Sequence, residues 1–231
     1  MIGNEFWAKY FKDYDKLNLM PSYVELLASI CQELRPEPGW LVLDIGSGTG
    51  NLAVRLKDMG CRVVALDFCR DALVCHQAKG DDSCLVLGDL TQGLPYRDNS
   101  FDAIVSNNAL YTLSAGNQIK AMKELHRVLK PGGRIVLANP RAGWKPLAIY
   151  RRGISLSVRA VGPGVTAFRM VRWIAPTVKM FYYNWKLAKE SRYHYFEPDE
   201  QRRLLEASGF RPVSDTKWVY GGQAMLDCAA K

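Results

Sequence analysis

The sequence contains no run of about 18 uninterrupted apolar residues, the length that a membrane-spanning helix requires. Its first residues, MIGNEFWAKYFKDYDK, do not show the basic and then apolar order of a secretory signal. The six cysteines include no Cys-x-x-Cys pair, so we expect reduced thiols and no metal site. These absences favour a cytoplasmic protein.

Positive charge is in excess, and it is concentrated in one segment. The chain has 231 residues and a formal net charge of +8. Between Arg141 and Phe196 there are eleven basic residues and a single acid, Glu190, so this segment carries +10 and the remainder −2. With 48% hydrophobic residues, the chain is long and apolar enough to form one globular domain with a core. We therefore expect a folded domain that carries a separate basic segment.

Apolar runs alternate with helix-like segments over the first two thirds of the chain. Amphipathic helical segments separate five expected strands, at 40–45, 62–67, 83–89, 101–108 and 134–140. Such alternation predicts parallel strands joined by right-handed crossovers. A last helix from Pro198 to Gly209 and two strands joined by Gly221-Gly222 as an antiparallel hairpin complete the pattern. The sequence therefore predicts an α/β fold with a doubly wound, mostly parallel, seven-stranded sheet.

The basic segment interrupts this pattern and divides the chain. We expect residues 1–39 to form an N-terminal helical cap, and residues 40–140 with 197–231 to form the main domain. Residues 141–196 are expected to be a basic, aromatic-rich lid inserted after the fifth strand, made of helical pieces that break near Pro176. Three uses of this insertion stay open: an amphipathic cover with solvated charges, a surface for an anionic membrane, or a face that binds nucleic-acid phosphates.

Three glycines at alternate positions, Gly46, Gly48 and Gly50, follow the first expected strand in LVLDIGSGTGNLAVRL. A sharp backbone turn without side chains lets peptide N–H groups approach a ligand closely. A dinucleotide site requires its third small residue at the position of Asn51, so the spacing argues against NAD(P). A phosphate-binding P-loop is excluded because no Gly-Lys-Ser/Thr follows.

The stretch LVLDIGSGTG resembles the first motif of the class I methyltransferases that depend on S-adenosyl-L-methionine (SAM). Further blocks similar to this family follow in order: VVALD, LVLGDL, LPYRDNSFDAIVSNNALYTL, ELHRVLKPGGRIVLANP and LLEASGF. The resemblance covers residues 40–140 and 197–231 and is to the small-molecule type, with a methyltransferase-11-like domain. It implies a Rossmann-like fold, SAM as cofactor and S-adenosyl-L-homocysteine as product.

The resemblance also implies roles for two acids that follow the second and third strands. Asp67 would hold the ribose hydroxyls of SAM, and Asp89 its adenine amino group. By position, Asp44 can order the amino-acid end of the cofactor, while Phe68 and Leu90 can cover the two faces of the adenine. Alternatively, Asp67 caps the following helix and Asp89 opens a turn. The candidate cofactor-binding residues are Asp44, Gly46, Ser47, Gly48, Gly50, Asp67, Phe68, Asp89, Leu90, Asn107 and Asn108.

Methyl transfer from a sulfonium is an in-line displacement, in which positioning of the acceptor matters most and a base is optional. The family often has a histidine after the fourth strand, where this chain has LYT at 110–112. We therefore name Tyr111 and His194 as the candidate catalytic residues, although Tyr111 could equally be a packed aromatic at the rim. His126 is expected to be structural and His76 to lie on the surface.

The acceptor is expected to be a small and largely apolar molecule. After the fourth strand, SNNAL replaces the Asn/Asp-Pro-Pro-aromatic run of base-nitrogen methyltransferases, and no Pro-Cys nucleophile is present, so nucleic acid is the less favoured partner. The short run YDKLNLMPSY resembles quinone-biosynthesis methyltransferases, which favours a lipid or quinone methyltransferase peripheral to a membrane as an alternative. An RNA methyltransferase and a non-catalytic SAM-binding module stay open as well.

Overall fold

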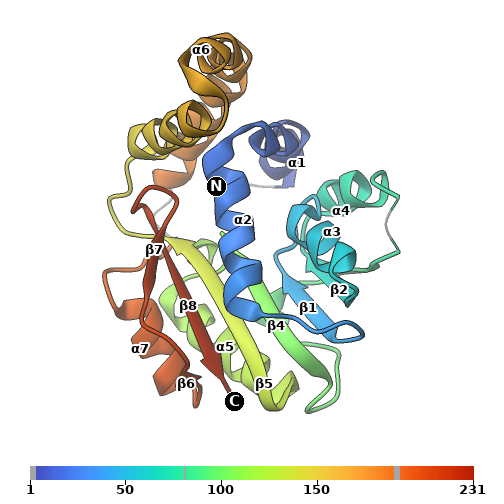
Figure 1. Cartoon of the computed structure of the whole chain (residues 1–231). Helices are drawn as coiled ribbons and strands as arrows, with labels where there is room; N and C mark the ends of the chain where they lie inside the picture. The colour runs from blue at the N-terminus through green and yellow to red at the C-terminus, as the bar shows by residue number, and fades with distance from the viewer. Residues whose placement is uncertain (1–3, 81, 190–192) are drawn as a thin grey trace.

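A single mixed sheet organises the chain, of which the computed structural model describes residues 4–80, 82–189 and 193–231 (Figure 1). Its strands are β1 (Leu41–Ile45), β2 (Arg62–Asp67), β3 (Cys84–Leu87), β4 (Phe101–Asn107), β5 (Leu129–Pro140), β6 (Arg211–Pro212), β7 (Lys217–Val219) and β8 (Ala224–Ala230). The strand order is β3-β2-β1-β4-β5-β8-β6, and β7 also pairs with β8. Strands β1 to β5 run parallel, and β8 is antiparallel to its partners. The expected Rossmann-like fold is confirmed.

Helices cover both faces of this sheet and its upper edge. They are α1 (Asn4–Tyr14), α2 (Pro21–Leu34), α3 (Asn51–Asp58), α4 (Arg70–Gln77), α5 (Ala115–Val128), α6 (Pro146–Ala188) and α7 (Glu200–Ala207). Three short 3-10 helices are η1 (Asp15–Leu19), η2 (Leu90–Gln92) and η3 (Leu110–Thr112). In Figure 1, α1 and α6 lie above the carboxyl ends of the parallel strands, where ligands bind in sheets of this kind.

Two apolar clusters, one on each face of the sheet, form the core. Side chains alternate along a strand, so Val42 and Val105 face the α2 side while Leu43 and Ile104 face the α5 side. A third cluster joins aromatic residues of α1 to α4 and α6 above the strands. The elements above the sheet are therefore anchored by apolar packing of their own.

The C-terminal strands differ from the expectation in number. β7 and β8 form the expected antiparallel hairpin around Gly221-Gly222, but the run before it forms two strands, so the sheet has eight strands rather than seven. Between β6 and β7, the Ser214 hydroxyl donates to Glu33 (3.0 Å) and the Thr216 hydroxyl donates to Asp227 (2.6 Å). The segment that separates β6 from β7 is thus held by side-chain hydrogen bonds.

The basic insertion leaves and rejoins the sheet at one place. Arg141 and Phe196 form a parallel bridge, and the Ala142 N–H donates to the Phe196 carbonyl at 2.7 Å. Between these points the chain folds mainly into α6, and the residues 190–192 lie outside the described part. The two ends of the insertion therefore lie side by side next to the sheet.

Helix α6 has two limbs that meet at Gly162 rather than near Pro176, so the expected position of the break was wrong. Gly162 has φ 79° and ψ 169°, whereas the chain is helical at Pro176. Glycine adopts this left-handed φ without a steric penalty, and Pro163 then begins the second limb where its missing N–H costs nothing.

Two ion pairs attach α6 to the N-terminal helices. The Arg152 guanidinium of its first limb binds both oxygens of Glu25 on α2, and Lys179 of its second limb binds Asp13 on α1 at 3.2 Å. In the described parts of the chain, no helix combines the length and the apolarity that crossing a bilayer would take.

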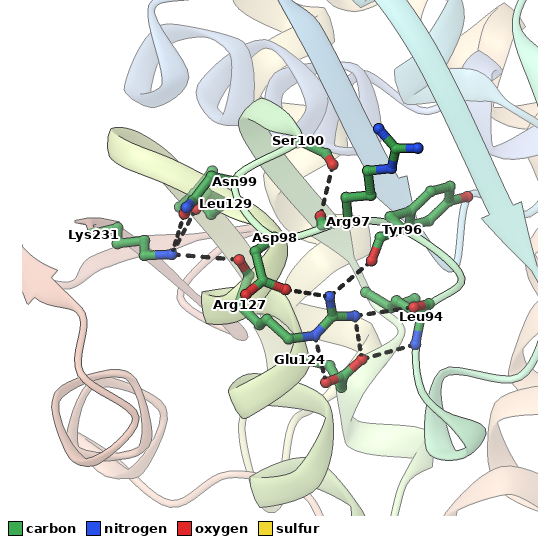
Figure 2. Close-up of polar contacts among 10 residues, drawn as sticks. All are labelled: Leu94, Tyr96, Arg97, Asp98, Asn99, Ser100, Glu124, Arg127, Leu129 and Lys231. Carbon is green, nitrogen blue, oxygen red and sulfur yellow. Dashed lines mark hydrogen bonds and ion pairs between the residues drawn. The ribbon is translucent and has the colours of Figure 1, made fainter.

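Arg127 near the end of α5 holds the loop that leads into β4 (Figure 2). Its guanidinium donates to both carboxylate oxygens of Glu124, at 2.9 and 2.8 Å. It also donates to the carbonyls of Leu94 (3.0 Å) and Tyr96 (2.8 Å) and to the Asp98 carboxylate (2.8 Å). The Arg127 hydrogen bonds lower the pKa of Glu124 to about 2. The start of β4, and through it the position of its carboxyl end, depends on this arginine.

Replacing Arg127 by alanine should lower the free energy of unfolding by about 2 kcal/mol, because hydrogen bonds to charged groups are lost and Glu124 is left without its partner. Since the folded pKa of Glu124 lies below its usual 4.5, the wild type should lose this stabilisation as the pH falls from about 4.5 toward 2. Urea denaturation at several pH values measures both effects. Arg97→Ala, which removes an exposed arginine of the same loop, is the control, and equal stability of the two variants would contradict the assignment.

Candidate cofactor and acceptor site

The glycine loop after β1 folds back onto β2. The N–H groups of Gly46 and Ser47 donate to the Leu66 carbonyl at 2.8 and 3.1 Å. A Cβ on Gly46 would lie 2.3 Å from the Ala109 Cβ, and one on Gly48 would lie 2.9 Å from the Phe11 ring. Both glycines are therefore required by close packing around the loop as well as by its backbone turn.

A cavity of about 470 Å³, including its opening, lies beside this loop; we call it the loop cavity. Three buried polar atoms line it and have no hydrogen-bond partner among the described residues: Asp44 Oδ2, Ser47 Oγ and Asn107 Oδ1. Asn107 Oδ1 accepts only, and so does Asp44 Oδ2 once the carboxyl is ionised, so the cavity suits a ligand that brings N–H donors and positive charge. The amino-acid end of SAM, with its ammonium and sulfonium, fits this donor and acceptor set.

Burial dominates the electrostatics of Asp44. Its side chain is buried at the end of β1, and this burial, together with the charge of nearby Asp67, raises its pKa from 3.8 to about 8. The carboxyl is thus largely protonated at neutral pH while no cation is near. A bound cation would favour its ionised form.

Asp67 links three parts of the site. One carboxylate oxygen accepts the Gly48 N–H and the other accepts the Cys69 N–H, both at 2.8 Å. The second bond closes a turn just before α4, whose N-cap is Cys69 and has no side-chain cap, so Asp67 does not cap this helix; the first bond reaches across to the glycine loop. Burial raises the pKa of this carboxyl, and the two N–H bonds oppose that shift.

A second cavity, of about 560 Å³ with its opening, lies between Asp67 and Asp89; we call it the acid cavity. Asp89 also begins η2, because it accepts hydrogen bonds from the Thr91 N–H and hydroxyl at 2.8 Å, so it opens a turn as the alternative states. Phe68 is 43% exposed and Leu90 is buried, and both line this cavity. The structure thus brings together the candidate residues for a nucleoside.

Gly50 lies against the His76 ring and lines neither of these two cavities. A Cβ on Gly50 would lie 2.2 Å from the His76 ring, and Gly50 is not among the residues lining the two cavities. His76 is fully buried, so the expectation that it lies on the surface was wrong. The missing side chain of Gly50 makes room for this imidazole. His126 packs edge-on against Phe210, with ring centroids 5.0 Å apart, in agreement with a structural role.

A third and larger space of about 830 Å³ with its opening lies beyond the loop cavity; we call it the aromatic cavity. Tyr10, Tyr14, Tyr111 and Asn108 line both cavities and so form the junction between them. Burial raises the pKa of Tyr10 and Tyr111 well above 10, so both phenols stay neutral and can donate hydrogen bonds at neutral pH. The remaining lining residues are Leu17, Met20, Pro140, Trp144, Pro146, Ile149, Tyr150, Thr177, Met180, Phe181, Asn184, Tyr220 and Gln223.

Helix α1 supplies site residues that the sequence reasoning missed. Trp7 and Phe11 line both the loop cavity and the acid cavity, and the Trp7 ring meets Phe68 edge-on at 5.8 Å. Tyr10 and Tyr14 line the junction. Aromatic residues spaced by three and four along FWAKYFKDY give the signal for an apolar helix face, but that pattern does not state what the face covers.

The structure separates the two candidate catalytic residues. Tyr111 is buried at the junction, where its ring tilts over Tyr195 with centroids 4.8 Å apart. His194 is absent from the lining of all three cavities, and its Nε2 lies 2.7 Å from Glu200 Oε1. The His194 N–H donates to the Tyr111 carbonyl at 3.0 Å. His194 therefore supports the Tyr111 segment and does not face the cavities.

The Rossmann-like sheet, the glycine loop after β1 and the acid at the end of β2 together define a class I SAM-dependent methyltransferase. The chain belongs to this family: residues 43–137 match the family model described as a methyltransferase domain. SAM is accordingly its cofactor. When bound, SAM supplies a methyl group on a cationic sulfonium.

Two relatives of the same name match most of this chain. The chain is 33% identical over 189 residues to the demethylmenaquinone methyltransferase of Clavibacter sepedonicus, a match that covers 80% of this chain and 71% of that protein. For the enzyme of the same name from Tropheryma whipplei (strain Twist), the identity is 30% over 219 residues, covering 92% and 84%. The structure of Burkholderia thailandensis 1,6-didemethyltoxoflavin-N1-methyltransferase, with its substrate and S-adenosylhomocysteine bound, has the same fold, with a TM-score of 0.64, 19% identity and coverage of 98% and 85%.

The pKa of Asp44 predicts how stability depends on pH. Because the folded pKa of about 8 lies above the unfolded value near 3.8, the unliganded protein should lose stability as the pH rises from about 4 to 8. Asp44→Asn should lack this loss and should be more stable than the wild type at pH 8. Thermal denaturation across this range measures the difference, and parallel pH profiles for both proteins would show that Asp44 is ionised without penalty.

Replacing Asp67 by asparagine should weaken SAM binding more than about tenfold, because the carboxylate that holds the loop and is expected to accept the ribose hydroxyls is lost. Isothermal titration calorimetry gives the affinity. Asp71→Asn, which neutralises an exposed acid in the first turn of α4, serves as the matched control. An affinity of Asp67→Asn equal to that of the control would refute the ribose assignment.

Proposed function

We propose that this methyltransferase acts on a demethylated quinol, an aromatic ring with hydroxyl groups and an apolar substituent. The observation that carries the proposal is the aromatic cavity, which meets the loop cavity at Tyr10, Tyr14 and Tyr111. The names of the relatives from Clavibacter sepedonicus and Tropheryma whipplei support the same acceptor class. Since such an acceptor resides in a bilayer, we also propose that the enzyme works at a membrane surface.

The chemistry of the cavity lining suits this acceptor. Among its described lining residues, tyrosine is the only titratable type, so an acceptor that carries phosphate or carboxylate would find no countercharge there. Its polar side chains are otherwise neutral: the Thr177 hydroxyl is buried without a hydrogen-bond partner among the described residues, Asn184 lies two helical turns further along α6, and Asn108 and Gln223 add amide groups. A mostly apolar cavity with a few hydrogen-bonding groups favours a planar ring with oxygen substituents over a nucleic acid.

The residues of the junction would act by positioning. Neutral tyrosine hydroxyls at Tyr14 and Tyr111 can donate hydrogen bonds to an acceptor oxygen and so orient the ring toward the loop cavity. Holding two reactants in line in this way can lower the reaction barrier by roughly 7–11 kcal/mol. Methyl transfer from SAM to a neutral quinol also releases one proton, and this proton passes to water because tyrosine is the only titratable type among the described lining residues.

Incubation of the purified enzyme with SAM and reduced demethylmenaquinone tests the acceptor. We expect a product heavier by one methylene group in mass spectrometry, together with S-adenosyl-L-homocysteine. Such turnover also distinguishes an enzyme from a non-catalytic SAM-binding module. An oligoribonucleotide that is methylated while the quinol is not would overturn the proposal in favour of RNA.

Tyr111→Phe should lower kcat by about tenfold and leave SAM affinity unchanged, because one hydrogen bond to the acceptor is lost while the ring packing remains. Steady-state kinetics with the quinol, together with calorimetry for SAM, separate the two quantities. Tyr182→Phe removes an exposed hydroxyl on α6 and is the matched control. If Tyr111→Phe has the same kcat as this control, Tyr111 is a packed rim residue only.

A further inference from the structure

The second limb of α6 is apolar on two opposite sides. Trp173, Met180 and Leu187 are buried against the rest of the protein. On the other side, Phe168 is 70% exposed and Val171 is 68% exposed. We call this side the outer face; it consists of Val165, Phe168, Val171, Ile174, Val178 and Trp185, all exposed. Phe168, Val171, Ile174, Val178 and Trp185 follow one another at intervals of three, three, four and seven residues, which places them on one side of the helix, with Val165 at the edge of that side.

Basic residues accompany the outer face. Arg172, four residues after Phe168, is exposed beside it, and Lys189 lies 3.6 Å from the centroid of the Trp185 ring. In the whole segment 141–196, eleven basic residues stand against one acid. An exposed apolar stripe with this charge pattern is typical of a helix that lies in the interface of an anionic membrane, with its aliphatic side chains below the headgroups and its basic groups among them.

Other occupants fit this pattern less well. A second copy of the chain would bring another predominantly basic segment against the first, and like charges would face each other across the contact. Nucleic acid would pair with the basic groups and stack on aromatic rings, but it offers no apolar surface for Val165, Val171 or Val178. An anionic bilayer accommodates both the charge and the aliphatic side chains.

The outer face adjoins the acceptor site through the same helix. Thr177, Met180 and Phe181 of the second limb line the aromatic cavity, and Phe181 is also partly exposed next to Tyr182. In Figure 1, α6 stands beyond the sheet at the outer end of the molecule, and the side chains of the outer face are exposed. One helix thus forms a wall of the cavity and a surface open to a partner.

We propose that the outer face of α6 docks on an anionic bilayer and that the acceptor passes from the bilayer into the aromatic cavity beside Phe181. The route of the acceptor rests on the proposed function, whereas the docking does not. The docked helix lies in the plane of the interface, and its basic side chains bind acidic lipid headgroups.

Flotation with vesicles of phosphatidylglycerol and phosphatidylcholine in equal parts, and of phosphatidylcholine alone, tests the docking. The full-length protein should float with the anionic vesicles, and added salt should weaken the binding because it screens the basic groups. Phe168→Ser combined with Val171→Ser should reduce the bound fraction roughly tenfold, since both side chains leave the apolar region. Circular dichroism and SAM affinity should remain as in the wild type.

Val74→Ser combined with Val213→Ser removes two exposed apolar side chains that lie outside α6, on α4 and directly after β6, and this variant should float like the wild type. Equal flotation of the Phe168/Val171 variant and the wild type would overturn the docking. So would a wild-type dimer in analytical ultracentrifugation that this variant loses, or binding to an oligonucleotide in place of vesicles.

Turnover separates docking from the acceptor assignment. The Phe168/Val171 variant should methylate a tail-less, water-soluble naphthoquinol at the wild-type rate and a vesicle-embedded quinol about tenfold more slowly. If neither quinol is methylated by the wild type, the proposed function fails while the flotation result stands. Equal rates of both proteins on the embedded quinol would refute entry from the bilayer.

Discussion

The cofactor side of the site depends on the buried Asp67 carboxylate. It accepts the Gly48 N–H of the loop after β1 and the Cys69 N–H at the start of α4, so one side chain fixes three elements relative to one another. Hydrogen bonds within the protein therefore set the position of the loop. What remains without a partner among the described residues, such as Asp44 Oδ2 and Asn107 Oδ1, is the part that a cationic ligand can satisfy. The cost of burying these atoms in the free protein would be recovered on binding.

Charge is divided sharply between the two halves of the site. The loop and acid cavities contain Asp44, Asp67 and Asp89, whereas the described lining of the aromatic cavity has no titratable side chain other than tyrosine. The acids favour binding of cationic SAM, and the neutral lining of the aromatic cavity favours an uncharged acceptor. No basic residue of the described part of the insertion lines the aromatic cavity.

Local patterns predicted the elements of the sheet well, because strands, helix ends and the glycine loop are set by neighbouring residues. Most candidate cofactor residues line a cavity for the same reason: carboxyl ends of parallel strands meet at one edge. The break in α6 was misplaced because Pro176 was given more weight than Gly162-Pro163-Gly164, where a glycine that adopts a left-handed φ precedes a proline suited to a first helical turn. His76 was misjudged because nothing nearby in sequence shows that Gly50 leaves space for it.

By itself, the sequence determined the parallel sheet, the turn at Gly46 and Gly48, and the position of an acid at the end of β2. Each of these follows from spacing and residue type along a short stretch. Only the tertiary structure decided that the aromatic face of α1 closes the cavities, that Tyr111 lies at their junction, and that His194 turns away toward Glu200. These decisions involve residues that are far apart in the chain. Their contacts depend on how the helices above the sheet pack against one another, which no local pattern encodes.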